Sequence, residues 1–509
     1  MRHIAFLLLY LVSVFFADNS YSQNNDTSQS YLDLVINHYN KRLQNGKDVY
    51  GPKATPFWMA SLNTSTGQYP VNDTRPADRP QRLYQNRPVE APKGASLYWD
   101  MPQIVVAYYL SQKTGNNTYA EAADAYIQAF FDNCVAKNGR FLWGNHYFYD
   151  AFRDSTVGFT YTGITEGVDF AEETGTLHEI RPVAPSWQAL WNINPKVTEV
   201  AIRSAIDGHL TDPVTGEFNR HAEGKRGHAF LEAGGVLVHM LAWLYDKTQD
   251  DTLLEQAKKI ASYSFANQGP ETGLLENSPN ENRWDKIYST TEVGLWARNL
   301  IEAANFVDTT TREQWIMMAD EAMSAWLQYG FDADKCDYYG ILRVATGEPV
   351  FEEDFLADFE SKTVYSPDNY TSFWEPLFPR HDYPMPFAES CLKLYQLTGK
   401  EQYKSAAYRW LTAIKNDLPA WDGKGGYADL YGRIIHFLLS GYETFSDDRF
   451  RMLAQDVAKE AVSQLYANGM FRTHTGEDRY DVADMFGLLA ASLIWLDTGE
   501  EPDMMGMFY

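Results

Sequence analysis

Three copies of one pattern decide the fold that this chain is expected to adopt. They are Leu110-Ser-Gln-Lys-Thr114-Gly115 before Tyr119-Ala-Glu-Ala-Ala123, Leu244-Tyr-Asp-Lys-Thr248 before Leu253-Leu-Glu-Gln-Ala257, and Leu394-Tyr-Gln-Leu-Thr398-Gly399 before Tyr403-Lys-Ser-Ala-Ala407. In each copy an apolar helix ends, a short turn follows, and a second helix begins with tyrosine or leucine. Looser copies run from Ala303 to Asp332 and from Phe437 to Tyr466. Repeated helical hairpins predict an all-α protein, an (α/α) toroid or barrel of about six or seven hairpins, with a superhelix of paired helices as the alternative.

The region before the repeats divides into two parts. Residues 1–22 combine Met1-Arg2-His3, an apolar run from Ile4 to Phe16 and Ser20-Tyr21-Ser22, which is typical of a secretory signal peptide. The run is too short to span a bilayer, and no cysteine follows it, so we expect a periplasmic or secreted protein without a lipid anchor. Residues 23–95 are polar and rich in Asn, Pro and Gly, which predicts an irregular N-terminal arm packed on the barrel of residues 96–509. One short helix is expected in this arm, around Tyr31 to Arg42.

Bulk composition restricts the partners. A formal net charge of −25 argues against nucleic acid and anionic membranes, and no later apolar stretch is long enough for membrane insertion. An acidic oligosaccharide or polysaccharide is still an expected partner, because local arginines and a metal reverse the field in one cleft. The three cysteines are too few for a disulfide framework, although one bridge is possible. The sequence does not indicate an oligomeric state.

Three short stretches carry residues of metal and anion chemistry. They are Trp143-Gly144-Asn145-His146, Thr176-Leu177-His178-Glu179 and Phe218-Asn219-Arg220-His221. Imidazole and carboxylate groups are the usual ligands of a divalent first-row metal, and arginine is suited to gripping a carboxylate. Each stretch alone has an ordinary structural explanation, so the evidence is their order along the chain.

That order resembles the pectate lyases of polysaccharide lyase family two. The matching stretches are Trp143-Gly144-Asn145-His146, Gly175-Thr176-Leu177-His178-Glu179-Ile180-Arg181, Leu190-Trp191-Asn192-Ile193-Asn194-Pro195, Asp207-Gly208-His209-Leu210 and Phe218-Asn219-Arg220-His221. The resemblance implies an (α/α) barrel, a divalent cation such as Mn²⁺ or Ca²⁺ held by His146, Glu179 and His221, and Arg220 as catalytic base. The family's second glycine of the first turn is Asn145 here, and the aromatic stretch from Tyr147 to Thr174 is longer. Both departures concern substrate binding more than metal binding.

The implied chemistry is removal of the C5 proton of a uronic acid. A cation and cationic side chains neutralise the sugar carboxylate while negative charge spreads into it. Because guanidinium holds its proton strongly, Arg220 is either the base or a carboxylate clamp, with a histidine or tyrosine taking the proton. His228 is a further candidate for substrate binding, whereas Tyr427, Arg433 and the stretch His381-Asp382-Tyr383 are expected to be structural.

The departing group at C4 decides the reaction. We expect a carbon–oxygen lyase that dehydrates the non-reducing-end uronate of an ulvan-type oligosaccharide, because the chain also loosely resembles the oligosaccharide dehydratases of ulvan-degrading bacteria. A chain-cleaving uronate lyase and an epimerase share the same first step. An unsaturated glucuronyl hydrolase, with Asp100 as half of an aspartate pair, and a non-enzymatic glycan-binding protein remain as alternatives.

Overall fold

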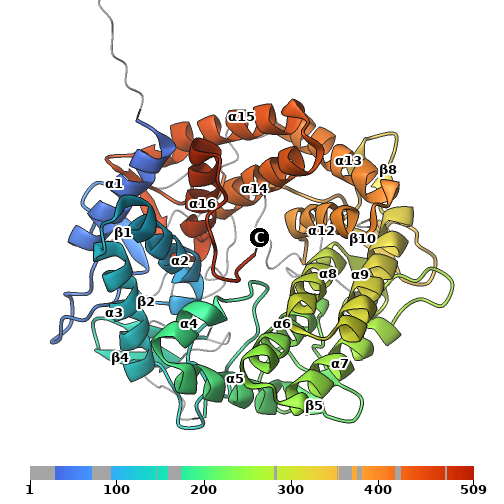
Figure 1. Ribbon diagram of the computed structural model, residues 1–509, viewed down its shortest axis with the longest axis horizontal. Helices are drawn as coiled ribbons and strands as arrows, with labels where there is room; N and C mark the ends of the chain where they lie inside the picture. Colours follow the sequence, from blue (N-terminus) through green and yellow to red (C-terminus); the bar gives the residue numbers. More distant parts are fainter. Residues whose placement is uncertain are drawn as a thin grey trace, which may run out of the picture.

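The helices form a closed ring with an inner and an outer wall (Figure 1). The computed structural model describes residues 29–70, 93–144, 146–158, 174–279, 284–351, 353–354, 369–374, 381–418, 426–475 and 478–508. The inner wall consists of α2 (Leu97–Thr114), α4 (Trp187–Ile193), α6 (Leu231–Thr248), α8 (Glu292–Ala303), α12 (Pro384–Thr398), α14 (Ala428–Phe445) and α16 (Phe486–Thr498). The outer wall consists of α1 (Tyr31–Asn45), α3 (Thr118–Asn133), α5 (Pro195–His209), α7 (Asp251–Ala266), α9 (Thr309–Tyr329), α13 (Glu401–Asp417) and α15 (Asp448–Leu465). Because α16 packs against α2, the ring closes, so the predicted (α/α) toroid is confirmed and the open superhelix is not formed.

The turns of the three sequence repeats join inner to outer helices. Gly115 and Gly399 end α2 and α12 with φ of 71° and 67°, the left-handed conformation that glycine adopts without strain. The second copy has no glycine, and Gln249 takes the same role with φ of 57°. Outer helix α5 begins with a capped first turn, in which the Asn194 side chain accepts from the Val197 backbone N–H and Pro195 is the first helical residue.

Short strands and 3₁₀ turns connect the hairpins. The strand pairs are antiparallel: β1 (Ser61–Asn63) with β13 (Arg479–Asp481), β2 (Gly94–Ala95) and β4 (Ser155–Gly158) on either side of β3 (Tyr147–Asp150), β5 (Leu210–Asp212) with β6 (Glu217–Phe218), β7 (Tyr288–Thr290) with β10 (Ile341–Arg343), β8 (Phe331–Asp332) with β9 (Asp337–Tyr338), and β11 (Tyr466–Ala467) with β12 (Met470–Phe471). The 3₁₀ turns are η1 (Trp284–Lys286), η2 (Ala304–Phe306) and η4 (Val482–Asp484).

The segment before the barrel contributes to the ring itself. Helix α1 covers the predicted 31–42 region and packs against α16, and β1 pairs with β13. Its buried Arg42 donates to the Asp100 carboxylate on α2 at 2.6 Å, which joins the segment to the inner wall. Residues 1–28, which contain the expected signal peptide, and residues 71–92 of the expected arm lie outside the described part of the chain.

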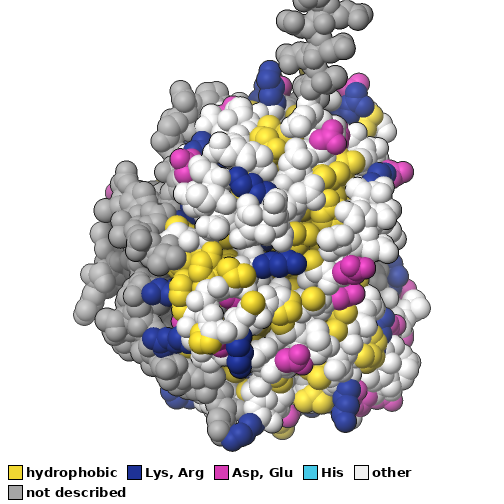
Figure 2. Space-filling model, turned by 90° about the vertical axis from the view of Figure 1, so that its left-hand side faces the viewer, with side chains coloured by type: hydrophobic (Ala, Val, Ile, Leu, Met, Phe, Trp, Pro, Cys, Tyr) yellow, Lys and Arg dark blue, Asp and Glu magenta, His cyan; other side chains and the backbone are white. Residues whose placement is uncertain are grey.

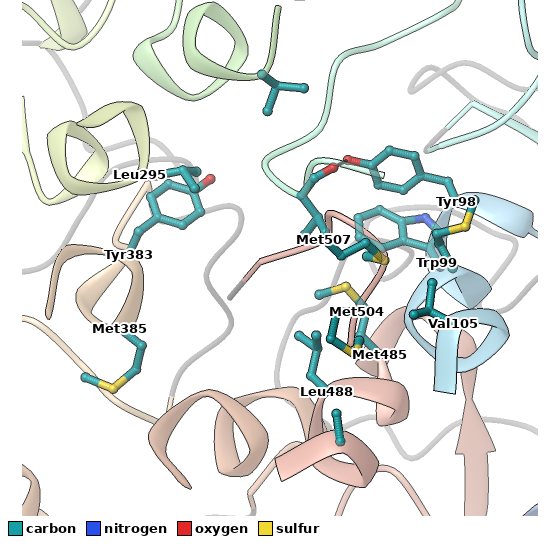
Figure 3. Packing of buried hydrophobic residues seen from close by; sticks show 14 of the residues in the cluster. Tyr98, Trp99, Val105, Leu295, Tyr383, Met385, Met485, Leu488, Met504 and Met507 are labelled. Atoms are coloured by element: carbon teal, nitrogen blue, oxygen red, sulfur yellow. Dashed lines mark hydrogen bonds between the residues drawn. The ribbon is translucent and has the colours of Figure 1, made fainter. Parts of the chain in front are cut away.

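The last residues of the chain turn back into the ring (Figure 1). Met504 and Met507 are buried, and they lie near Trp99 and Tyr98 of α2 (Figure 3). The Ser186 hydroxyl donates to the Met505 carbonyl, and the Phe508 ring packs edge-on against His239. The tail therefore occupies part of the ring interior.

Three remaining features are the surface composition, the cysteines and the hydropathy of the helices. On the face in Figure 2, acidic, basic and apolar side chains are interspersed. Cys134, Cys336 and Cys391 are all free thiols, so the bridge that the sequence left possible is not formed. Among the described helices, none is both long and apolar enough to cross a membrane.

Candidate active site

A backbone bridge brings two of the three predicted stretches together. The Ile180 N–H donates to the Arg220 carbonyl at 2.8 Å, and the Ala222 N–H donates to the His178 carbonyl at 2.9 Å. These bonds set Glu179 directly opposite His221 in an antiparallel bridge. Since opposite residues of such a pair project to the same face, their side chains meet, with Nε2 of His221 3.2 Å from Oε1 of Glu179.

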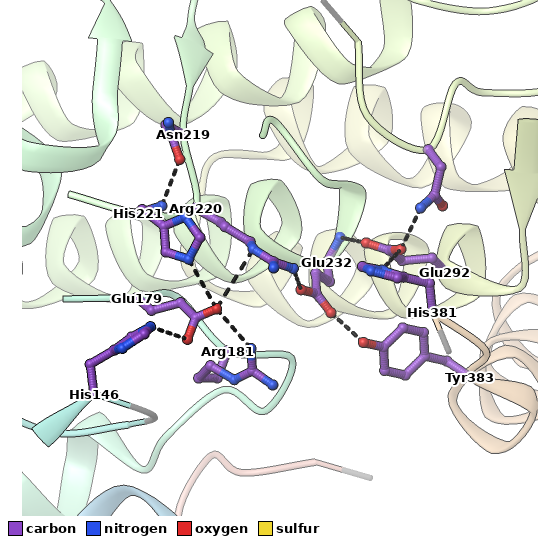
Figure 4. Close-up of polar contacts among 11 residues, drawn as sticks. His146, Glu179, Arg181, Asn219, Arg220, His221, Glu232, Glu292, His381 and Tyr383 are labelled. Carbon is purple, nitrogen blue, oxygen red and sulfur yellow. Dashed lines mark hydrogen bonds and ion pairs between the residues drawn. The ribbon is translucent and has the colours of Figure 1, made fainter. Parts of the chain in front are cut away.

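The third stretch supplies His146 from a tight turn. Gly144 has φ of 81°, which only glycine adopts readily, and the Trp99 indole N–H donates to its carbonyl at 3.1 Å. The turn leads into β3 and places Nε2 of His146 3.6 Å from Oε2 of Glu179 (Figure 4). Asn145, the departure from the family pattern, lies outside the described residues.

His146, Glu179 and His221 fit a divalent cation. One ligand atom from each lies within 4.8 Å of the other two. Among the described residues no group donates a hydrogen bond to the buried Oε2 of Glu179, although a buried carboxylate oxygen normally has a partner. Burial alone would raise the pKa of Glu179, but Arg181, His221 and Arg220 together hold that pKa well below its ordinary value. The carboxylate is therefore ionised, as a metal ligand must be.

Arg220 lies between two buried carboxylates. Its Nε is 3.6 Å from Oε1 of Glu179, and its NH1 donates to Oε1 of Glu232 at 3.2 Å. The guanidinium also lies 4.5 Å from the centre of the Phe230 ring. The sequence predicts Arg220 beside the expected cation ligands, and in the structure it lies beside one of these residues, Glu179.

Two histidines of the same region form a structural chain. The Trp143 indole N–H donates to Nε2 of His178 at 3.1 Å, and Nδ1 of His178 lies 2.7 Å from Nε2 of His209. Nδ1 of His209 lies 2.7 Å from the Asn219 carbonyl. A donor at one end and a carbonyl at the other make both imidazoles neutral, and burial lowers the pKa of His209 to about 3. This hydrogen-bonded chain connects the three stretches through Trp143, His178 and Asn219.

Sequence reasoning missed several buried polar residues of the site. Arg181 NH1 donates to Oε1 of Glu179 at 2.9 Å, and it was quoted only as part of a motif. Glu232 and Glu292 lie in the first turns of α6 and α8, and His381 and Tyr383 precede α12. Tyr383 donates to Glu232, and Nδ1 of His381 lies 3.1 Å from Oε2 of Glu292. The sequence pattern that could have indicated Glu232 and Glu292 is a glutamate in the first turn of successive inner helices.

The structure also places the other residues that the sequence analysis singled out. The His228 ring centre lies 5.8 Å from that of His221, and the His228 carbonyl accepts from the Arg220 N–H. Tyr427 packs against His474 at 4.4 Å between ring centres, and Arg433 is buried in α14. His381 and Tyr383, expected to be structural, contact the carboxylates of Glu292 and Glu232 respectively.

Asp100 is enclosed in the ion pair with Arg42. Both side chains are fully buried, and the Tyr126 hydroxyl donates to the second Asp100 oxygen at 2.9 Å. With both oxygens engaged, Asp100 is not placed to protonate a substrate, which removes the residue on which the hydrolase alternative depended.

Asp100→Asn is expected to destabilise the fold without affecting turnover. The change leaves the buried Arg42 cation without its counter-charge, which costs about 3–5 kcal/mol of unfolding free energy. Urea unfolding measures the loss, and activity per folded molecule should equal that of the wild type. A stable variant that has lost activity would restore the hydrolase hypothesis.

Known proteins match the chain at two levels. Residues 105–232 match the family described as periplasmic pectate lyase, and this range contains the three stretches, so the resemblance drawn from them is confirmed there. Among solved structures, the chain is similar to a family 76 glycoside hydrolase from a bovine Bacteroides thetaiotaomicron strain, which is 12% identical, with a TM-score of 0.45 over 92% of this chain and 78% of that one. The GH76A α-1,6-mannanase from Salegentibacter sp. HEL1_6 is 8% identical, with a TM-score of 0.44 over 92% of this chain and 100% of that one. A family 105 glycoside hydrolase from C. acetobutylicum ATCC 824 is 12% identical, with a TM-score of 0.38 over 63% of this chain and 77% of that one. The family match indicates a carbohydrate-active enzyme.

Proposed function

We propose that the protein is a metal-assisted lyase that removes the C5 proton of a uronic acid and eliminates the group at C4. The observation that carries this proposal is the convergence of His146, Glu179 and His221, with Arg220 alongside. His146, Glu179 and His221 would hold the divalent cation, Mn²⁺ or Ca²⁺ being the candidates. When bound there, it supplies Lewis-acid neutralisation of the uronate carboxylate.

Arg220 is proposed as the catalytic residue. The planar guanidinium of Arg220 is suited to binding the uronate carboxylate. Because Arg220 is buried, its attraction to that carboxylate is stronger than it would be in water. In the favoured reaction Arg220 takes the C5 proton as base. The clamp role remains the alternative for Arg220, and His228, beside His221, is proposed to contact the sugar.

Within this class we favour a dehydratase acting on the non-reducing-end uronate of an acidic, ulvan-type oligosaccharide. The tail from Gly499 to Phe508 supports end-on binding, because it occupies part of the ring interior and so restricts passage of a long chain. A chain-cleaving uronate lyase is the second candidate, supported by the pectate lyase match over residues 105–232. We further propose export through residues 1–22, a periplasmic or secreted location, and one barrel domain over residues 96–509, to whose outer wall the preceding arm of residues 23–95 adds helix α1.

A panel of uronate oligosaccharides tests these alternatives. Mass spectrometry of the products should show loss of one water, with a rise in ultraviolet absorbance from the conjugated acid. Cleavage of the oligosaccharide together with a rise in ultraviolet absorbance would favour the lyase. Exchange of the C5 hydrogen without loss of water, cleavage or a rise in absorbance would favour the epimerase. Binding without any of these changes would contradict an enzymatic function.

A further inference from the structure

A second buried polar cluster lies on the side of Arg220 away from the cation ligands (Figure 4). It consists of Glu232, Glu292, His381 and Tyr383, and every member is fully buried. Oε1 of Glu232 accepts from Arg220, and Oε2 of Glu232 accepts from the Tyr383 hydroxyl. The cluster therefore touches Arg220 through Glu232.

The hydrogen bonds argue against a second cation in this cluster. Glu232, Glu292 and His381 could offer ligand atoms within 4.8 Å of one another. Both oxygens of Glu292 are already used, because Oε1 accepts from the Glu232 N–H at 2.8 Å and Oε2 from Asn277 at 2.7 Å. Both oxygens of Glu232 are also used, so the cluster is better explained as a hydrogen-bonded network.

We infer that Glu232 is the proton acceptor behind Arg220 and acts on the substrate through it. This inference rests on the proposed function and deepens it. Oε1 of Glu232 takes one NH1 proton of Arg220, and the lone pair that this leaves on NH1 accepts the proton of the breaking C5–H bond. Arg220 is a guanidinium before and after the step, so no arginine that is neutral at rest is needed as base.

The electrons and protons balance over the cycle. The electron pair of the C5–H bond spreads into the uronate carboxylate and then forms the C4–C5 double bond. The C4 oxygen departs with this step and takes a proton from solvent to leave as water. After the product leaves, Glu232 returns its proton to NH1 of Arg220 as NH1 releases one to the solvent that enters the site, and the starting state is restored.

The surroundings of Glu232 suit a proton acceptor. It faces the cations Arg220 and Arg181, the carboxylate of Glu292, His381, and the phenols of Tyr383 and Tyr98. Burial and the adjacent Glu292 raise the pKa of Glu232, with Arg220 acting in the opposite direction. Such a carboxylate holds a proton more readily than one in water.

Glu232→Gln tests the relay, because glutamine keeps the size and can still accept a hydrogen bond from Arg220. We expect kcat to fall about 10³-fold, within the range for loss of a proton-transfer group, with KM changed less than about threefold. Metal content, measured by mass spectrometry, should stay at the wild-type level. Exchange of the substrate C5 hydrogen in D₂O, followed by NMR, should be lost in parallel, and the acidic limb of the pH–rate profile should disappear. Glu232→Asp should restore part of the activity.

Glu389→Gln is the matched control. Glu389 is likewise buried and paired, with Arg298 at 3.4 Å and His436 at 2.6 Å, but it has no contact with Arg220. It should lose stability and keep wild-type kcat and C5 exchange. If Glu232→Gln does not fold, Tyr383→Phe provides the test, because loss of its hydrogen bond should shift the acidic limb to higher pH.

The outcomes separate the two proposals. Wild-type C5 exchange in Glu232→Gln, or an unshifted limb in Tyr383→Phe, overturns the relay while the lyase function stands. Absence of elimination and of C5 exchange by the wild type on every uronate tested overturns the proposed function, and the relay with it.

Discussion

His146→Ala and His221→Ala are each expected to purify without the divalent cation and to lose almost all turnover. Each change removes one of three ligands, and even loss of a group that only supports a ligand typically costs 10–100-fold in metal affinity. Neither change leaves an unpaired buried charge, because the side chain removed is an imidazole. Helical circular dichroism should therefore match the wild type while metal content falls.

Glu179 requires a separate reading. Its carboxylate faces both Arg181 and Arg220, so Glu179→Ala leaves two buried cations without a counter-charge and is expected to cost about 3–5 kcal/mol of unfolding free energy. Loss of metal in this variant alone would therefore not identify a ligand.

His228→Ala is the matched control for the two histidine variants. This imidazole lies 5.8 Å from that of His221 between ring centres, but it is not one of the three converging groups. It should keep the cation at wild-type stoichiometry. Wild-type metal content in both His146→Ala and His221→Ala would show that the site has been misassigned.

Arg220→Ala is expected to reduce kcat by about 10³-fold or more while the cation remains bound. The loss reflects the removal of both proton transfer and charge stabilisation in the transition state. Since Nε of Arg220 lies 3.6 Å from the Glu179 carboxylate, its removal takes a positive charge away from the neighbourhood of the cation. Metal affinity should therefore stay the same or increase, as calorimetric titration would measure.

Two further variants define what Arg220 supplies. Arg220→Lys keeps the positive charge but loses the planar fork, so recovery of most activity would indicate a purely electrostatic role. Arg298→Ala is the control, because Arg298 is also buried between carboxylates, Glu389 and Glu302. It should lose stability without losing turnover per folded molecule. Wild-type turnover in Arg220→Ala would exclude Arg220 from catalysis.

The ring could be predicted from the sequence because its signals are local. An apolar helix, a turn with threonine and glycine, and a second helix are properties of short segments, and the left-handed Gly115 and Gly399 end inner helices as the repeats predict. The expected cation ligands followed from a motif order, and the structure brings those three residues together. That they bind a metal stays a prediction.

The cluster beside Arg220 could not be predicted in the same way. Glu292 and Tyr383 lie 60 and 151 residues after Glu232 along the chain, and each of the three sits at the start of a different inner helix. In sequence, such a glutamate only indicates a favourable charge in a first helical turn. The ion pair of Asp100 with Arg42 could not be predicted for the same reason, because it depends on where α1 packs.

The sequence by itself determined the helical-hairpin ring and the three stretches that carry imidazole, carboxylate and guanidinium groups, because periodicity and motif order are written along the chain. Only the tertiary structure decided which carboxylates surround Arg220, and that Asp100 is buried in an ion pair with Arg42. Those contacts arise where the starts of distant inner helices meet inside the ring, and no local pattern records that meeting.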